Sequence, residues 1–390
     1  MEKLIKNAFS IYITKFGNQI IGLMLIPLIS KKLTSDELSF YLLYLSLTGF
    51  SVVLFDYSSS IIGVKSVAKN IFSVRTFAKY NFAHKITLSA IFLSFGFVAY
   101  YVTRSWEYFL LVVACIPIGM KDVWYYQARL NMSKVVWFDI LIRTLLLLFV
   151  FAIPSALFNI KVLLCAFIFF ESISYLFYSY PLFSFIRYSD KKDFKKSVIT
   201  NIKNGIHVFS ARLSGAIYTN LTLPISLVFF SSEKIIVFGV CERILRIIVS
   251  LISPIITTVY PYLSSDDKDK KRIYNALKSF GIFLTVVSFL FIEKIAQIIF
   301  DIHIDIAIWQ LVIFSIVPYF IVMGSVNGLL ELNLRGGYKQ NNAILQLSVL
   351  AYLVTFMFIG MFGDERFLFL CLLVPEFSFY AVSMMYIRKK

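Results

Sequence analysis

The stretch VWFDILIRTLLLLFVFAIPSAL, residues 136–157, is long and apolar enough to cross a lipid bilayer as one helix. A second run of this kind, residues 162–186, follows after only four residues, so the two predict a pair of membrane-spanning helices joined by a short turn. Hydrophobic residues make up 59% of the 390 positions and charged residues only 15%, which is more apolar surface than a soluble domain can bury. We therefore predict an all-α integral membrane protein.

Further apolar runs bring the expected number of transmembrane helices to about twelve. They lie near residues 8–30, 37–62, 83–103, 107–128, 206–230, 235–262, 276–299, 306–332, 343–363 and 366–387. The expected organisation is an N-terminal lobe over 1–187, a basic cytoplasmic linker over 188–204 and a C-terminal lobe over 205–390.

The net charge of +16 is distributed as in a membrane protein. With a cytoplasmic N-terminus, 25 of the 38 basic residues fall in inside segments and seven in outside loops, which predicts that both termini are cytoplasmic. No basic stretch is long enough for a nucleic-acid groove. The four cysteines lie within apolar runs and lack metal-site spacing, so we expect no metal and no cofactor.

An offset of 197 residues aligns the two halves of the chain. Ile5-Lys6-Asn7 matches Ile202-Lys203-Asn204, Lys15 matches Arg212, and Pro27 matches Pro224. Because each repeat holds six helices, both run in the same direction. We expect two six-helix lobes related by a pseudo-two-fold axis along the membrane normal, with a transport path between them.

Charges inside membrane helices cost several kcal/mol and are functional candidates by default. Lys15 and Arg212 have no acid within four residues on their own helices, and with Arg243 they would give a cavity a positive field that suits a diphosphate. Arg246 joins this set of expected cavity cations. The alternative is that these cations pair with Asp56 or Glu331 from a neighbouring helix.

The intramembrane acids allow two interpretations. Asp139–Arg143 and Glu242–Arg246 are spaced to pair along one helix face. Glu171 and Glu376 each lie alone in the last helix of a half and could carry a coupling proton, or they could be neutral acids bonded to a neighbouring helix. Asp56 and Glu331, near inner helix ends, are expected to act in coupling or gating or as helix-end features, and Lys121-Asp122 is expected inside the fourth helix.

Several motifs resemble the O-antigen flippases of the Wzx type. They are the stretch from Pro27 to Tyr41, the pair Asp56-Tyr57, and Cys241-Glu-Arg-Ile-Leu-Arg246. One departure is Ser58, where the family usually has glycine. The resemblance implies the superfamily that contains MATE transporters and the lipid II flippase MurJ, with two six-helix lobes around a central cavity.

What the resemblance implies for function is a flippase in the bacterial inner membrane. It would carry undecaprenyl-diphosphate-linked oligosaccharide repeat units from the cytoplasmic to the periplasmic leaflet, with membrane lipids around the lipid tail. H⁺ or Na⁺ would be the coupling ion, and a polysaccharide polymerase and chain-length regulator would be partners. A MATE-like exporter of small molecules is one alternative; a polyprenyl-linked glycan enzyme is another, less favoured because a catalytic loop is not evident.

Overall fold

The computed structural model describes residues 17, 21–22, 24–64, 74–129, 132–186, 192–230, 235–246, 248–249, 252, 270–300, 307–333 and 337–388. All regular secondary structure in these ranges is helical, as predicted. Eight of the described helices are long and apolar enough to cross a membrane. The predicted spans near 136–157 and 206–230 are also helical. The span near 8–30 lies largely outside the described residues, and the span near 235–262 is helical over 235–246, with 253–262 outside the described residues.

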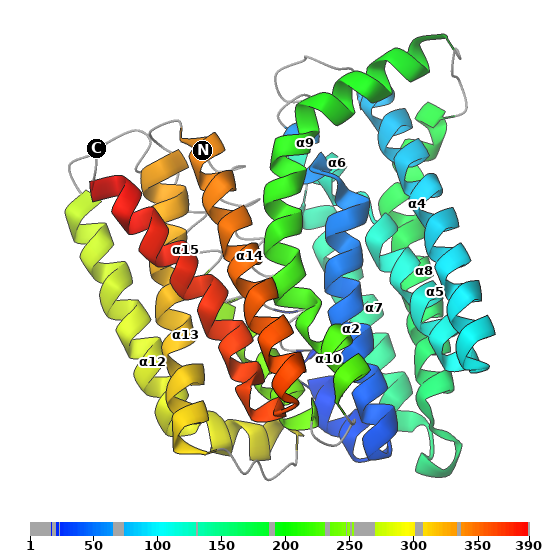
Figure 1. Ribbon diagram of the computed structural model, residues 1–390. Coiled ribbons are helices and arrows are strands. Elements are labelled where there is room, and N and C mark those ends of the chain that lie inside the picture. Colours follow the sequence, from blue (N-terminus) through cyan, green and yellow to red (C-terminus); the bar gives the residue numbers. More distant parts are fainter. Residues whose placement is uncertain are drawn as a thin grey trace. The chain divides into compact units, whose positions relative to one another are not determined.

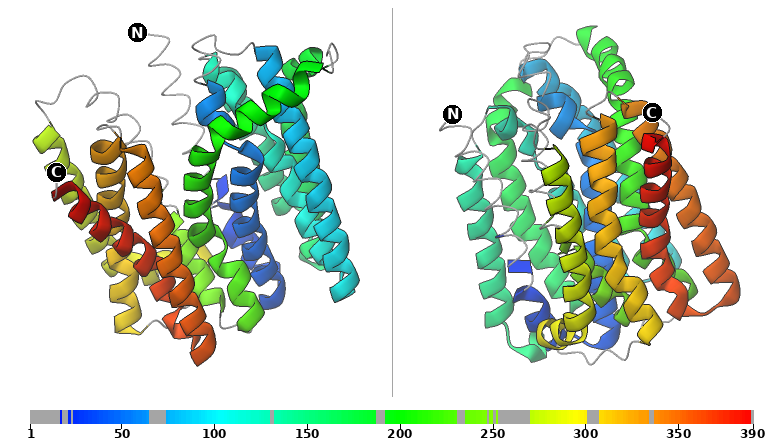
Figure 2. Two further views of the ribbon diagram at one scale, coloured as in Figure 1. Left: turned by 45° about the horizontal axis from the view of Figure 1, so that its top comes forward. Right: turned by 90° about the vertical axis from the view of Figure 1, so that its left-hand side faces the viewer.

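The helices gather into two compact units, Met1–Leu213 and Ser214–Lys390 (Figure 1). From residue 192 onward, the predicted linker, 188–204, is helical and forms the beginning of α9, Lys192–Asn220. This first part of α9 lies across one end of the unit 1 helices, and residues 205–212 then contact the end of α2, Ser35–Asp56, and the turn that follows it (Figures 1 and 2).

Unit 1 is built around α5, Trp106–Met120, which packs against α2, α4 (Val74–Thr103) and α8 (Ile160–Ile186). The helix α7, Ser133–Ala152, packs on α8. On α4 very few residues are buried, and large apolar side chains cover its surface. They include Phe95, Phe97, Val98, Tyr101 and Val102. A face of this composition and length fits contact with lipid tails rather than water.

Unit 2 has two helix pairs joined through one packing surface. The helix α13, Ile308–Ser325, packs against both α12 (Lys270–Phe300) and α15 (Leu370–Arg388), and α15 also packs on α14 (Tyr338–Phe362). Shorter helical pieces complete the unit: α10 (Thr222–Phe229), η3 (Val326–Asn333) and η4 (Glu365–Phe369).

The fourth predicted span, 107–128, is not one continuous helix, which corrects the sequence prediction. The helix α5 ends at Met120, Lys121 and Asp122 are non-helical, and α6 begins at Val123 and ends at Ala128. Pro117 lacks a backbone N–H and so removes one hydrogen bond from the last turn of α5. The break therefore frees backbone carbonyls that need other donors.

The second half has a break of its own in the seventh predicted span. The helix α9 ends at Asn220, and α10 begins at Thr222 with Pro224 in its first turn. Pro224 cannot donate a hydrogen bond to the preceding turn, which favours a break at this point.

A strained turn follows α2. Tyr57 and Ser58 both have a left-handed backbone, with φ of 36° and 67°, a conformation that favours glycine. The chain then enters the π-helical turn η1, Ser59–Gly63, which packs against α6.

The loop between the first predicted span and α2 supports three helix ends. The Lys32 ammonium donates to the backbone carbonyls of Val150 (2.7 Å) and Ile153 (2.6 Å), where α7 ends. One Glu37 carboxylate oxygen accepts from the backbone N–H of Ile160 at the start of α8 (3.1 Å), and the other closes a capping box with Thr34. These contacts satisfy backbone groups that helix ends leave without intrahelical partners.

We predict that Lys32→Met lowers the melting temperature of the purified protein in detergent by several degrees. The substitution removes the charged donor from carbonyls at the end of α7, at a cost of about 1.5–3 kcal/mol. The control is Lys161→Met, which removes only an ion pair with Glu107 in which Lys161 is 54% exposed. Such pairs contribute little, so equal shifts in the two variants would contradict the capping role.

Candidate functional site

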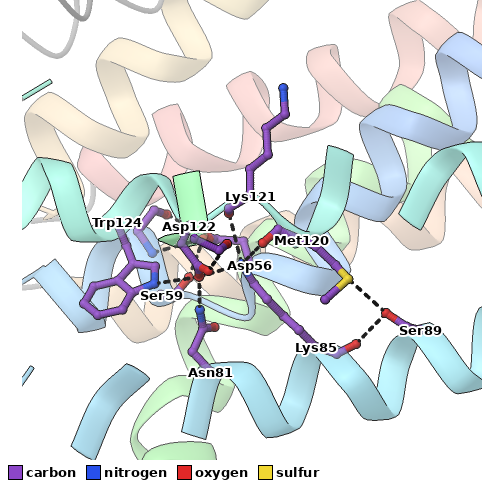
Figure 3. Close-up of polar contacts among 11 residues, drawn as sticks. Asp56, Ser59, Asn81, Lys85, Ser89, Met120, Lys121, Asp122 and Trp124 are labelled. Carbon is purple, nitrogen blue, oxygen red and sulfur yellow. Dashed lines mark hydrogen bonds and ion pairs between the residues drawn. The ribbon is translucent and has the colours of Figure 1, made fainter. Parts of the chain in front are cut away.

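Asp122 is the centre of a buried polar cluster in unit 1 (Figure 3). One of its carboxylate oxygens accepts from Asn81 Nδ2 (2.7 Å), Lys85 Nζ (2.9 Å) and Trp124 Nε1 (3.1 Å). The other accepts from Ser179 Oγ at 2.7 Å. The carboxylate therefore has four donors drawn from α4, α6 and α8, and its charge is fully compensated.

Lys85 ties this cluster to the break in the fourth span. Its ammonium also donates to the carbonyls of Met120 (2.8 Å) and Lys121 (3.0 Å), which the break has freed. The three donors of the ammonium are thus all used. The Lys85 side chain is only 2% exposed and is paired with Asp122. This saturated cluster stabilises the break and has no free group for a ligand.

Four charges of alternating sign form a second cluster. Lys121 Nζ lies 2.6 Å from Glu171 and 3.2 Å from Asp139. Arg143 lies 3.5 Å from Asp139 and 3.8 Å from Glu171. The predicted pairing of Asp139 with Arg143 is confirmed. The prediction that Glu171 is a lone carboxylate is wrong, because two cations from other segments reach it.

The second cluster is neutral overall, and its members come from the break between α5 and α6, from α7 and from α8. Removing one member leaves a buried charge uncompensated, which is far more costly than the pair is stabilising. The adjacent residues Lys121 and Asp122 therefore belong to different clusters, and the break between helices is what lets their side chains diverge.

A third cluster joins the end of α2 to α9. Arg212 Nη1 forms an ion pair with Asp56 and donates to Ser60 Oγ at 3.0 Å. Asp56 also accepts from Ser59 Oγ (2.6 Å), from the Ser60 backbone N–H (3.1 Å) and from Ser60 Oγ (2.8 Å). Of the two arrangements considered for Arg212, pairing with Asp56 is thus the one that this structure has.

In unit 2, Arg246 closes the break between α9 and α10. It forms an ion pair with Glu242, one turn earlier, as its spacing predicts. It also donates to the Thr219 carbonyl (2.6 Å) and to Asn220 Oδ1 (2.6 Å), at the last turn of α9. Arg246 therefore acts as a C-terminal cap for α9.

The remaining candidates are dispersed. Glu376, in α15, lies near the Tyr218 hydroxyl. Glu331 is half-buried in η3, and Arg243 is half-buried in the helical stretch 235–246. Lys15 lies outside the described residues. Among the predicted site residues, the structure pairs Asp56 with Arg212. Ser59 and Ser60 hydrogen-bond to this pair, and nothing in the sequence pattern marks these two serines as part of the site.

Two units of membrane-length helices, with charges paired inside them, define a polytopic helical membrane protein. More specifically, its fold is that of the MATE transporters of the MOP superfamily. A multidrug resistance MATE family transporter in an outward-facing conformation aligns with a TM-score of 0.68 over 99% of this chain and 94% of its own, at 13% identity.

Two further solved structures show the same likeness. A MOP superfamily transporter from Pyrococcus furiosus, in which the reverse polarity of the binding pocket suggests a different function, aligns with a TM-score of 0.68. The identity is 12%, over 99% of this chain and 95% of that one. A MATE structure in the bent conformation gives 0.63, at 12% identity and the same coverage. No protein-family model and no curated protein sequence matches the chain.

We predict that Asp122→Asn or Lys85→Met alone destabilises the protein by roughly 3–5 kcal/mol, because each leaves a buried charge without its partner. The double variant should recover part of this loss, since it removes both charges. Thermal unfolding in detergent and the yield of monodisperse protein measure the effect. Strictly additive losses in the double variant would show that the two charges do not stabilise each other.

Proposed function

We propose that this protein is a membrane transporter whose cargo is anionic. The likeness in fold to MATE and MOP transporters supports the first part. The second part is supported by the cations on its apolar helices and by the Asp56–Arg212 pair in particular. Because an anion is attracted most strongly where water is largely excluded, an accessible guanidinium on a membrane helix suits an anionic cargo.

The observation that carries this proposal is a difference in exposure. In the Asp122 cluster both charges are 2–7% exposed, and in the Lys121 cluster Lys121 and the two acids are 4–9% exposed, with Arg143 at 23%. Arg212 is 29% exposed and Asp56 is 18% exposed. In the third cluster both the acid and the cation are therefore open to a bound molecule, whereas the acids of the first two are closed and Arg143 lies beside two of them.

The cargo that we propose is an undecaprenyl-diphosphate-linked repeat unit of O-antigen or another polysaccharide. Arg212 and Arg243, with Lys15, would bind the diphosphate, because the planar guanidinium matches two phosphate oxygens at once. Arg246 is left out of this set because its donors already cap α9. The lipid tail would stay in the bilayer while the lobes expose the head group first to the cytoplasm and then to the periplasm.

The remaining parts of the proposal follow from the cargo. The protein would lie in a bacterial inner membrane with both termini in the cytoplasm, and a polymerase with its chain-length regulator would consume the delivered units. H⁺ or Na⁺ would bias the cycle. Glu376 and Glu331 are the acids proposed for coupling, since Glu171 is neutralised by Lys121 and Arg143.

A MATE-like exporter of small molecules is the second candidate. The observation that favours it is the multidrug resistance transporter among the structures with this fold. Such a protein would have to admit organic cations, which Arg212 and Arg243 would repel. The two candidates therefore differ in the sign of the cargo charge.

We predict that the chain restores surface polysaccharide to a strain lacking its lipid-linked oligosaccharide flippase, and that Arg243→Ala loses at least about tenfold of this activity because a charged contact to the cargo is removed. Surface polysaccharide is measured by gel and by antibody, with membrane levels of the protein matched.

The control for this experiment is Arg366→Ala, which removes an exposed arginine paired with Asp364 and should retain full activity. Lack of restoration by the wild-type chain, together with lowered drug susceptibility of the strain expressing it, would favour the exporter.

A further inference from the structure

All hydrogen-bond acceptor sites of the Asp56 carboxylate are occupied. Its two carboxylate oxygens receive the Ser59 hydroxyl, the Ser60 hydroxyl, the Ser60 N–H and Arg212 Nη1. A carboxylate has about four acceptor sites, so this one is fully occupied. A carboxylate held in this way is poorly suited to taking up and releasing a proton during transport, which was the role considered for it from the sequence.

The turn that follows Asp56 is also held against α9 by direct contacts. Ser58 Oγ donates to the Gly205 carbonyl at 3.2 Å, and the Tyr57 ring packs on the Phe209 ring at 4.5 Å between centroids. With Arg212, these contacts fall at positions 205, 209 and 212, which lie on one face of a helix. The left-handed turn at Tyr57 and Ser58 places both residues, together with Asp56, against this face of α9. Strained backbone of this kind is often found at functional sites.

Arg212 keeps one edge of its guanidinium open. Within the described part of the chain, both of its hydrogen bonds come from Nη1. The opposite edge, formed by Nε and Nη2, meets no acceptor among the described residues, and the side chain is 29% exposed. This is the edge that can donate two parallel hydrogen bonds to a phosphate group.

Arg246 provides an internal comparison. It too is paired with an acid, but Nη1 donates to Asn220 and Nη2 to both Thr219 and Glu242. Its two terminal nitrogens are therefore occupied by the chain itself. The same residue type thus serves two purposes, a cap at Arg246 and an outward-presented edge at Arg212.

We infer that Asp56 is a positioning residue that holds Arg212 by Nη1 so that its Nε and Nη2 edge binds a phosphate group of the cargo. The inference rests on the proposed function and adds to it a specific role for the acid. Asp56 would raise the affinity for phosphate by fixing the guanidinium in place, although its own charge repels the ligand. An acid that merely competed with the cargo for Arg212 would lower that affinity.

The sign of the effect at Asp56 tests the inference. The affinity of the purified protein in nanodiscs for undecaprenyl diphosphate is measured by native mass spectrometry, with phosphatidylglycerol as the competing anionic lipid. Asp56→Asn is expected to weaken binding by about tenfold, because the neutral amide holds the guanidinium less firmly. Tighter binding would mean that Asp56 competes with the cargo, and unchanged binding with a lower melting temperature would mean a purely structural pair. Either result overturns the inference.

Arg212→Lys tests the ligand edge separately. It keeps the charge and the ion pair but has no planar fork, so we expect about tenfold weaker binding of the diphosphate with little change in melting temperature. Equal affinity would overturn the inference. Arg366→Lys, on an exposed arginine, is the matched control.

The source of the phosphate is decided by the competition. If phosphatidylglycerol displaces undecaprenyl diphosphate at equal concentration, the site binds lipid phosphate in general, and the proposed cargo is wrong even if both variants weaken binding. If the wild-type chain restores surface polysaccharide and both variants do so equally well, the proposed function stands and the inference about Asp56 fails.

Discussion

A cation inside a membrane helix must be compensated within the protein, and this constraint organises unit 1. Lys85, Arg143 and Arg212 lie on different helices and Lys121 lies in the break between α5 and α6, and each is paired with an acid from another element. Since an uncompensated charge costs several kcal/mol, these pairs determine which helices can lie together. They join α4, α7 and α8 to the break that follows α5, and they join α2 to α9, where apolar packing alone would leave the helices free to slide.

The ion pairs in unit 1 depend on a break in a helix, and that break is in turn stabilised by one of the paired charges. Lys121 and Asp122 serve opposite clusters only because the helix is interrupted between Met120 and Val123. The carbonyls that this interruption frees are satisfied by Lys85. A break of this kind is tolerated at membrane depth where it is buried in protein. At Tyr57 and Ser58 the strain is of a different kind, and it places Asp56 beside Arg212.

The sequence was sufficient for the fold class, since apolar runs of about 20 residues admit little else. It was also sufficient for Asp139–Arg143 and Glu242–Arg246, because these pairs depend only on helical periodicity. It was insufficient for Glu171, because the partners Lys121 and Arg143 reach it from other segments. For Arg212, the sequence left both Asp56 and Glu331 as possible partners, and only the three-dimensional structure shows that the partner is Asp56.

The loop at Lys32 has a consequence for how this protein can be studied. Because Lys32 and Glu37 lie five positions apart and hold the end of α7 and the start of α8, the length of this loop is fixed by both. A reporter or epitope inserted among residues 31–34 would separate the two contacts and uncap two distant helices together. Loss of the fusion protein at this site would therefore indicate misfolding and carry no information about which side of the membrane the loop faces.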